Sequence, residues 1–272
     1  MSPPHLPTEN AKLQVSDPAR TQTILVALSG PSCSGKTTLA RLLRDALAPH
    51  AFILHEDDFY LTDAKIPVKK VEDGRELQDW DCFESIDVEG LRDMLAFIKE
   101  HGRVKDDFQS KEDQNAVGDV KVDMEVVKSW KSTFARAMEG IPKGRLSVAI
   151  IDGFLLFSET MRQVRELFDV RLLLRLDHDT VKRRREARMG YVTLEGFWQD
   201  PEGYVDLIVW PNYVKDHAFL FKNGDVNGEL DSDVCESLDI HGMPKEAVED
   251  MTKCFKWAAN ILLKSLESVC TG

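Results

Sequence analysis

The stretch LSGPSCSGKTTLARLL, residues 28–43, decides the fold of this chain. From Gly30 to Thr37 it fits the pattern GxxxxGK[ST], and it lies between an apolar run at 23–28 and a helical pattern. The glycines of such a loop let the backbone curl, so that N–H groups and the start of the helix face a phosphate chain. The stretch therefore predicts a nucleoside triphosphate site. It does not by itself separate kinases from GTPases, ATPases or transporters.

The side chains of this loop have distinct expected roles. Lys36 is expected to neutralise charge on the β- and γ-phosphates, and the hydroxyl of Thr37 is expected to hold Mg²⁺. The predicted nucleotide contacts in this segment are Gly30, Pro31, Ser32, Cys33, Ser34, Gly35, Lys36, Thr37 and Thr38.

The composition is typical of an ordinary globular protein. The 272 residues are 43% hydrophobic and 30% charged, and 35 basic against 47 acidic residues leave a net charge of −12. This balance argues against a nucleic-acid partner. No run of 18 apolar residues predicts a membrane span, and residues 1–22 have no apolar core of a secretory signal. Five scattered cysteines without a CxxC pair favour a reducing compartment, so we expect a cytoplasmic protein.

Apolar runs alternate with helical patterns along the chain. Strands are predicted at 23–28, 51–55, 145–157 and 169–176 and around 235–240, and helices at 39–47, 88–102, 122–138, 179–188 and 245–267. This alternation predicts βαβ units, and hence an α/β fold with a doubly wound parallel sheet of the P-loop NTPase type.

The remaining stretches suggest how the chain is divided. We expect a disordered polar tail over 1–22 and a single P-loop kinase domain over 23–268. Residues 103–144 are predicted to be a surface insertion, because 103–121 are charged and nearly without pattern. The four arginines within 182–188 are expected to form a helical lid over 182–209 that clamps phosphate, although such a charge run can also be a solvated helix face.

Acidic residues follow two of the predicted strands. Asp57 and Asp58 come at the end of the second strand, and Asp152 ends the strand that contains IIDG, 150–153. The carboxyl ends of parallel strands line the ligand crevice of an open α/β sheet, where a carboxylate can act as a general base or bind Mg²⁺. The alternatives are solvated or capping aspartates, and for Asp152 a strand that simply ends in a turn.

Six motifs occur in a fixed order along the chain: GPSCSGKTT, EDDFY, DWDCFESID, IIDGFLLF, KRRREAR and VWPNY. In this order they resemble the nicotinamide riboside kinases, within the wider uridine kinase and phosphoribulokinase-like group of P-loop kinases. The resemblance covers residues 23–102 and 145–266, and IIDGFLLF and VWPNY are its more discriminating parts.

The resemblance implies ATP- and Mg²⁺-dependent phosphorylation of the ribose 5′-hydroxyl of nicotinamide riboside, and also of nicotinic acid riboside, as a step toward NAD. It implies that Asp57 is the base and shares Mg²⁺ with Thr37. Asp152 stands where glutamate is expected, so its reach to the metal is one methylene shorter. Asp81 is expected to hold the ribose 2′- and 3′-hydroxyls, and Trp80 to stack on the base.

The resemblance also assigns the lid. Arg184 and Arg188 are expected to reach the ATP phosphates, and Arg185 the acceptor, while Tyr191 closes over the base and Asp200 adds a further acceptor contact. The other implied contacts are Asp58, Phe59 and Tyr60 on the acceptor side and Met243, Pro244 and Lys245 at the adenine. None of the seven histidines is given a role.

The ring of the acceptor separates the hypotheses that remain open. A pyridinium riboside carries a fixed positive charge, and Trp80 with Tyr191 would bind it by cation–π contacts worth about 1–2 kcal/mol. A uridine or cytidine kinase is the alternative with the same core. A nucleotide-binding regulatory protein without catalysis is a third hypothesis, but it would not need Lys36, Asp57 and Asp81 together.

Overall fold

The computed structural model describes residues 21–111, 120–142, 144–188, 190–192 and 196–271. The predicted tail over 1–22 lies outside the described residues except for its last two, of which Gln22 already belongs to the first strand.

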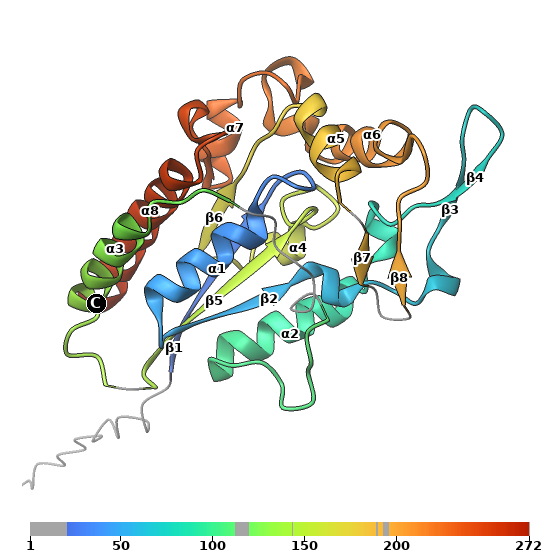
Figure 1. The fold of residues 1–272 in the computed structure, drawn as a ribbon. Helices are drawn as coiled ribbons and strands as arrows, with labels where there is room; N and C mark the ends of the chain where they lie inside the picture. The colour runs from blue at the N-terminus through green and yellow to red at the C-terminus, as the bar shows by residue number, and fades with distance from the viewer. Residues whose placement is uncertain (1–20, 112–119, 143, 189, 193–195, 272) are drawn as a thin grey trace, which may run out of the picture.

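A five-stranded parallel sheet forms the centre of the fold (Figure 1). Its strand order is β2-β5-β1-β6-β9, and every neighbouring pair is parallel. The strands are β1 (Gln22–Ser29), β2 (Ala51–His55), β5 (Leu146–Gly153), β6 (Val170–Leu173) and β9 (Ile240–Gly242). This topology confirms the predicted doubly wound α/β sheet. The strand expected around 235–240 lies further along the chain: residues 235–237 end helix α7 (Ser232–Ser237), and β9 begins at Ile240.

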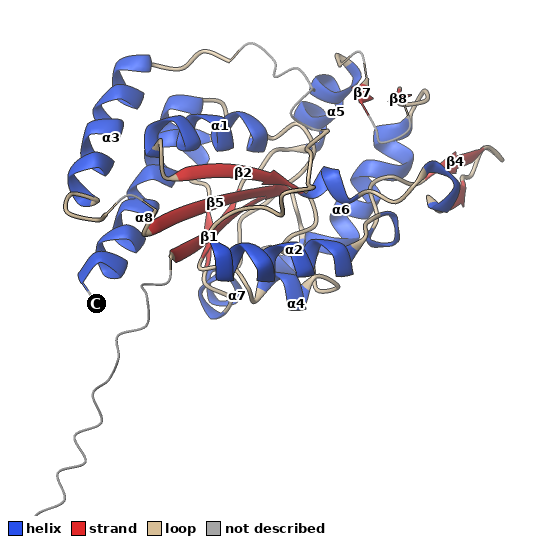
Figure 2. Ribbon diagram, turned by 90° about the horizontal axis from the view of Figure 1, so that it is seen from below, coloured by secondary structure: helices blue, strands red, loops and turns tan. Residues whose placement is uncertain are grey.

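Helices cover both faces of the sheet (Figure 2). One face carries α1 (Lys36–Leu47), α3 (Met124–Ala137) and α8 (Met251–Thr271), and the other carries α2 (Val88–His101), α4 (Arg162–Arg165) and α7. Val26 and Leu28 of β1 pack with the first group, whereas Leu25 and Ala27 pack with the second, because side chains alternate along a strand. A strand buried on both faces needs the unbroken apolar run found here.

Helix α3 lies within the stretch 103–144 that we expected on the surface. Phe134 is fully buried, and Val127 lies with it in the core cluster formed with α1 and α8. The apolar residues of this helix recur at three- and four-residue spacing, so one face packs against the other two helices. The earlier part of the stretch also packs, since Phe108 stacks on Phe59 with ring centroids 5.8 Å apart. One face of α3 therefore belongs to the core and Phe108 packs half-buried against the core, whereas most other side chains of α3 are exposed.

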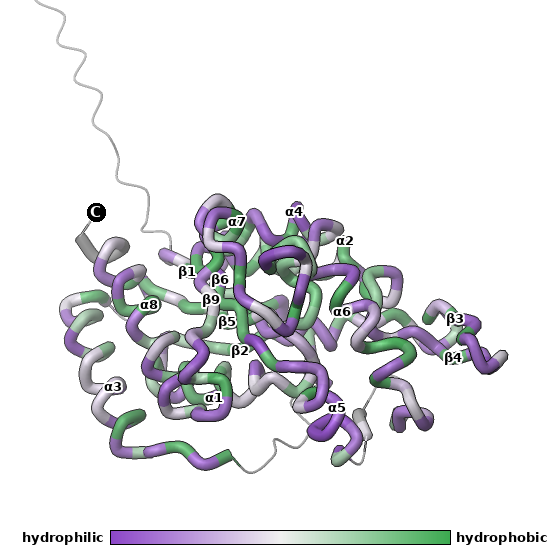
Figure 3. The backbone as a smooth tube through the Cα atoms, turned by 90° about the horizontal axis from the view of Figure 1, so that it is seen from above, coloured by the Kyte–Doolittle hydropathy of each residue, from purple (hydrophilic) through white to green (hydrophobic). Residues whose placement is uncertain are grey.

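A second group of elements lies beyond the carboxyl ends of the strands (Figure 1). It comprises the hairpin β3 (Val68–Lys70) and β4 (Glu76–Gln78), helix α5 (His178–Glu186), the pair β7 (Tyr191–Val192) and β8 (Phe197–Trp198), the π-helix η5 (Val205–Val209) and helix α6 (Trp210–His217). A small apolar cluster that includes Leu77, Val181 and Tyr204 joins the hairpin to α5 and η5. Figure 3 shows hydrophobic strands in the interior and a hydrophilic α5.

Short 3-10 helices complete the described chain: η1 (Glu56–Phe59), η2 (Asp63–Lys65), η3 (Phe83–Ser85), η6 (Ala218–Leu220), η7 (Lys222–Gly224) and η8 (Lys245–Ala247). Within the part of the chain that is described, none of the helices has both the length and the hydropathy needed to cross a bilayer.

Candidate active site

The phosphate loop connects β1 to α1. Gly30 has a φ of 146°, and a Cβ there would lie 2.5 Å from the carbonyl oxygen of Leu174. Cys33 and Gly35 also have positive φ values, of 59° and 95°, so the backbone curls tightly over a few residues. Lys36 Nζ donates to the carbonyl oxygens of Gly30 and Pro31, each at 3.0 Å, which keeps the ammonium over the loop. Helix α1 begins here without a side-chain cap, and uncapped N–H groups at a helix start are suited to an anion.

The ends of α1, β2 and β5 bring three expected residues together. Thr37 Oγ1 donates to Asp152 Oδ2 at 2.6 Å. Burial, followed by the charge of Asp152, raises the pKa of Asp57 to about 6. Burial also opposes ionisation of Asp152, but the charge and hydrogen bond of His55 and the hydrogen bond of Thr37 outweigh it and lower the pKa of Asp152. Thr37, Asp57 and Asp152 therefore form one cluster of oxygen donors.

His55 is a partner of this cluster that sequence reasoning missed. Its Nδ1 lies 2.5 Å from Asp152 Oδ1, and both side chains are buried. The two residues are opposite each other in the pairing of β2 with β5. The position of His55 two residues before the acidic pair was the available sequence signal, and only the strand register turns it into a contact.

Glu56 was also missed, and it fixes the position of η1. Its side chain is fully buried, and Oε2 accepts from the N–H groups of Phe154 at 2.6 Å and Leu155 at 3.1 Å. Burial raises the pKa of Glu56 to about 8, although these two backbone bonds lower it in part. A Cβ at Gly153 would overlap the Glu56 carboxylate, so the glycine of IIDG makes room for it. Glu56 thereby holds η1, with Asp57, against the end of β5.

Three neighbouring residues expected at the acceptor have different surroundings. Asp58 Oδ1 accepts from the N–H of Lys111 at 2.6 Å. Phe59 packs in the core beneath Phe108. Tyr60 lies edge-on to Trp80 with ring centroids 5.4 Å apart.

A buried ion-pair network forms the acceptor side. Arg185 from α5 donates to both carboxylate oxygens of Asp81, at 2.8 and 3.0 Å, and to both of Asp200, at 2.6 and 3.2 Å. Burial raises the pKa of Asp81, and the charge and hydrogen bonds of Arg185 offset only part of that effect. The guanidinium carbon lies 5.5 Å from the ring centroid of Tyr204. The structure thus brings Asp81, Arg185 and Asp200 together.

Two tryptophans lie beside this network. The ring centroids of Trp80 and Trp198 are 5.6 Å apart, and Trp198 Nε1 donates to Asp200 Oδ1 at 2.9 Å. Trp198 is a neighbour that sequence reasoning missed. The backbone of Tyr191 pairs with that of Trp198, but the Tyr191 side chain lies outside the described residues. A third ring between two others needs them about 7 Å apart, so the tryptophans as placed leave no room for one.

The remaining predicted contacts lie around the phosphate loop and β9. Arg184 Nη1 donates to the Cys33 carbonyl at 3.2 Å, which brings α5 to the loop. Arg188 is half-buried just after α5. Met243 is buried in the core cluster of α1 and α8, and Lys245 pairs with Glu229 at 3.1 Å. Pro244 lies between them, directly before η8.

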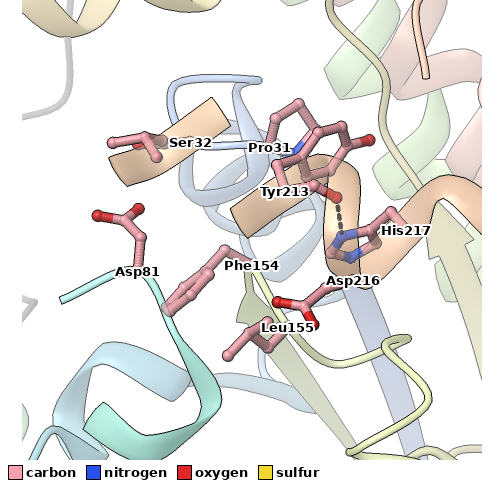
Figure 4. A pocket seen from close by; sticks show the side chains of 9 residues that line it. Pro31, Ser32, Asp81, Phe154, Leu155, Tyr213, Asp216 and His217 are labelled. Carbon is pink, nitrogen blue, oxygen red and sulfur yellow. Dashed lines mark hydrogen bonds between the residues drawn. The ribbon is translucent and has the colours of Figure 1, made fainter. Parts of the chain in front are cut away.

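One small open pocket joins the phosphate loop to the acceptor side (Figure 4). Its lining residues are Pro31, Ser32, Asp81, Phe154, Leu155, Val209, Tyr213, Asp216 and His217. They come from the phosphate loop, from the segments after β4 and β5, and from η5 and α6. A molecule in this pocket would therefore contact the phosphate loop and Asp81 at once, as transfer of a group between two substrates requires.

A phosphate loop that shares a pocket with a second polar site, in a doubly wound parallel sheet, defines a P-loop kinase. The chain is 39% identical over 247 residues to nicotinamide riboside kinase of Schizosaccharomyces pombe, which covers 90% of this chain and 99% of that protein. It is 34% identical to nicotinamide riboside kinase of Saccharomyces cerevisiae, over 89% of this chain and 97% of that protein. The chain belongs to the nicotinamide riboside kinase family.

More distant relatives are found as well. Human nicotinamide riboside kinase 1 is 26% identical over 71% of this chain and 76% of its own length. No family model matches the sequence. Among solved structures, a putative fructose transport system kinase from Silicibacter sp. TM1040 has a TM-score of 0.36 at 23% identity, covering 63% of this chain and 73% of that one. A possible uridine kinase from Bacillus stearothermophilus has a TM-score of 0.39 at 17% identity, covering 72% and 83%.

Proposed function

We propose that this protein transfers the γ-phosphoryl group of ATP to the 5′-hydroxyl of nicotinamide riboside, and of nicotinic acid riboside, and so supplies mononucleotide for NAD synthesis. Kinship with nicotinamide riboside kinases over 90% of the chain supports the substrate. The observation that carries the reaction is the pocket that Pro31 and Ser32 of the phosphate loop share with Asp81.

Asp57 is proposed as the general base. A pKa of about 6 leaves its carboxylate mostly ionised at neutral pH and still basic enough to accept the proton of the attacking hydroxyl. Glu56 holds η1 against the end of β5 and so keeps Asp57 in place beside Asp152. Lys36, over the phosphate loop, is proposed to neutralise phosphate charge as the group moves.

Thr37, Asp57 and Asp152 are proposed to hold Mg²⁺. The donor set fits this ion, because Mg²⁺ prefers oxygen ligands and usually keeps several waters and substrate phosphates in its shell. In the described residues no group of three or more His, Cys, Asp or Glu could hold a metal alone, which suits a cation bound together with ATP. The repulsion that raises the pKa of Asp57 next to Asp152 would also fall with a divalent charge nearby. When bound, the ion would supply charge neutralisation at the phosphates.

The acceptor is proposed to bind at Asp81 and Arg185. The carboxylate of Asp81 offers hydrogen-bond acceptors directly beside the donors of the Arg185 guanidinium. The vicinal hydroxyls of a ribose can bond to the acceptors and to the donors. The cationic pyridinium ring is proposed to contact Trp80, with Trp198 or Tyr191 on its other side. Because Trp80 and Trp198 are in contact, we propose that the segment 182–209 acts as a lid that moves to admit the ring.

We also propose the cytoplasm as the location. The support is chemical: Cys82, Cys235 and Cys254 are buried as thiols, as in a reducing compartment.

A riboside panel tests the proposal. Purified full-length protein with ATP and Mg²⁺ is assayed for ADP release, and products are identified by mass, with nicotinamide riboside, nicotinic acid riboside, uridine and cytidine as acceptors. We expect the pyridine ribosides to be preferred. A strong preference for uridine or cytidine contradicts the substrate assignment. ATP binding without phosphorylation of any riboside would indicate a non-catalytic nucleotide-binding protein.

The base is tested by Asp57→Asn, with Asp58→Asn as the matched control. We expect Asp57→Asn to lower kcat by about 10²–10⁴-fold with ATP binding retained. Asp58 bonds to the Lys111 backbone instead, so Asp58→Asn should keep kcat within about threefold, because no base is removed. Equal turnover by Asp57→Asn and the unaltered enzyme would refute the assignment.

A further inference from the structure

The backbone that carries Trp80 and Asp81 lies outside regular secondary structure. It runs from the end of β4 at Gln78 to η3, which begins at Phe83. We call residues 78–81 the acceptor segment, because the two expected acceptor contacts are part of it. The hairpin still holds the start of this segment, because Gln78 pairs with Val68 and the N–H of Asp79 donates to the Pro67 carbonyl at 2.7 Å. Trp80 and Asp81 lie beyond the ladder, so other elements must fix their position.

Tyr204, directly before η5, bonds to the acceptor segment twice. Its hydroxyl donates to the Gln78 carbonyl at 2.9 Å and accepts from the N–H of Trp80 at 3.0 Å. The Tyr204 side chain is fully buried, so water does not compete for these bonds.

Asn212 of α6 makes the second connection, through Asp79. Its Nδ2 donates to Asp79 Oδ1 at 2.8 Å and to Oδ2 at 2.9 Å. Asp79 Oδ1 in turn accepts from the N–H of Asp81 at 3.2 Å. Asp79 and Asn212 are each 7% exposed, and in the described part of the chain no cation pairs with Asp79. The side-chain donor that contacts the Asp79 carboxylate is therefore the neutral amide of Asn212.

Helix α6 also faces the pocket. Tyr213, Asp216 and His217 of this helix line the pocket between the phosphate loop and Asp81 (Figure 4). Asn212 is the fourth residue of the VWPNY motif, 209–213. The proposed phosphoryl transfer gives no role to this motif. The same helix therefore forms a wall of the pocket and bonds to the acceptor segment.

We propose that Asn212 is a positioning residue for the acceptor. Its amide orients the Asp79 carboxylate, Asp79 holds the N–H of Asp81, and the pair sets where Asp81 and Trp80 meet the riboside. This inference rests on the proposed riboside kinase function. It predicts that the pair acts on the acceptor and leaves ATP, on the other side of the pocket, unaffected.

Three variants test the pair. Asn212→Asp places a second carboxylate against Asp79, and Asn212→Leu removes the donor without adding charge. The exchange Asp79→Asn with Asn212→Asp restores the contact in reverse, because Asn at position 79 can donate to the new carboxylate and still accept from the Asp81 N–H. Asn260→Leu is the control, since Asn260 is exposed on α8 and its side chain donates to the Lys256 carbonyl at 2.8 Å.

The readouts are KM for nicotinamide riboside, KM for ATP, kcat, riboside Kd by calorimetry and the thermal midpoint. We expect Asn212→Asp and Asn212→Leu to raise riboside KM and Kd about tenfold or more, which is the loss of one bond to a buried charged group. ATP KM should stay within about twofold. The exchange should bring riboside KM back to within about threefold of the unaltered enzyme, and Asn260→Leu should change nothing.

The outcomes separate the two levels of the inference. If the unaltered enzyme phosphorylates the riboside but folded Asn212→Asp keeps its riboside KM within twofold, the positioning role is wrong and the proposed function stands. Equal rises in riboside and ATP KM, or no recovery in a folded exchange variant, also refute the positioning role. If the unaltered enzyme binds and phosphorylates no riboside, the proposed function fails, and the acceptor role of Asn212 with it.

Discussion

Replacing Arg185 by alanine tests how well the acceptor side of the pocket is closed to water. The Arg185 side chain is 6% exposed, and its partners Asp81 and Asp200 are 7% and 16% exposed. Alanine removes all four hydrogen bonds to these carboxylates and leaves the buried charge of Asp81 and the partly buried charge of Asp200 without this cation. Breaking a buried ion pair from one side costs about 3–5 kcal/mol of unfolding free energy. For a chain of this size that corresponds to a fall of roughly 10 °C in the thermal midpoint.

Urea unfolding followed by tryptophan fluorescence, without nucleotide, measures this loss. The control is the triple variant Arg185→Ala, Asp81→Asn, Asp200→Asn, in which the stranded charges are gone. We expect the triple variant to recover at least half of the lost stability and to remain inactive, because Asp81 is replaced. A loss below about 1 kcal/mol for Arg185→Ala would refute the reasoning, since it would mean that both carboxylates reach water.

Three further predictions concern stability and the phosphate loop. Burial lowers the pKa of His217 from 6.5 to about 4, so the unfolded chain takes up this proton first as the pH falls. The free energy of unfolding should therefore drop by up to about 3 kcal/mol between pH 6.5 and 4. In urea unfolding, His217→Gln should remove this part of the dependence of stability on pH, and an unchanged dependence would contradict the prediction. Phe134→Ala should lower the free energy of unfolding by about 3–5 kcal/mol in the same assay, because it opens a cavity between α1, α3 and α8. A loss under about 1 kcal/mol would place α3 outside the core. Gly30→Ala should abolish ATP binding in calorimetry, because its Cβ would overlap the Leu174 carbonyl, and Gly74→Ala, with nothing within 4 Å of its Cβ, should bind ATP normally.

The phosphate loop and the sheet could be predicted because their patterns are local. Eight consecutive residues from Gly30 to Thr37 define the loop, and long apolar runs define β1 and β5. The error at 235–240 has a local cause too. Asp231 caps α7 by accepting from the N–H groups of Asp233 and Val234, while β9 has only three residues and no readable alternation.

The position of α3 shows a different limit. Its apolar spacing predicted a helix at the right place in the chain, but spacing does not say which surface the apolar face meets. Phe134 became a core residue only because α1 and α8 supply the other walls. The charged residues before the helix suggested a surface insertion. Local charge describes the neighbours along the chain and does not show which elements pack together.

From the sequence alone, the triphosphate loop, the parallel α/β sheet and the family resemblance followed, since each depends on residues close together in the chain or on motif order. The tertiary structure alone decided which side chains meet. Arg185 reaches Asp81 across 104 positions, and His55 reaches Asp152 across 97. It also decided charge states, because the pKa values of Asp57, Glu56 and His217 shift mainly through burial. Burial is a property of the whole packed chain, and no short stretch of sequence carries it.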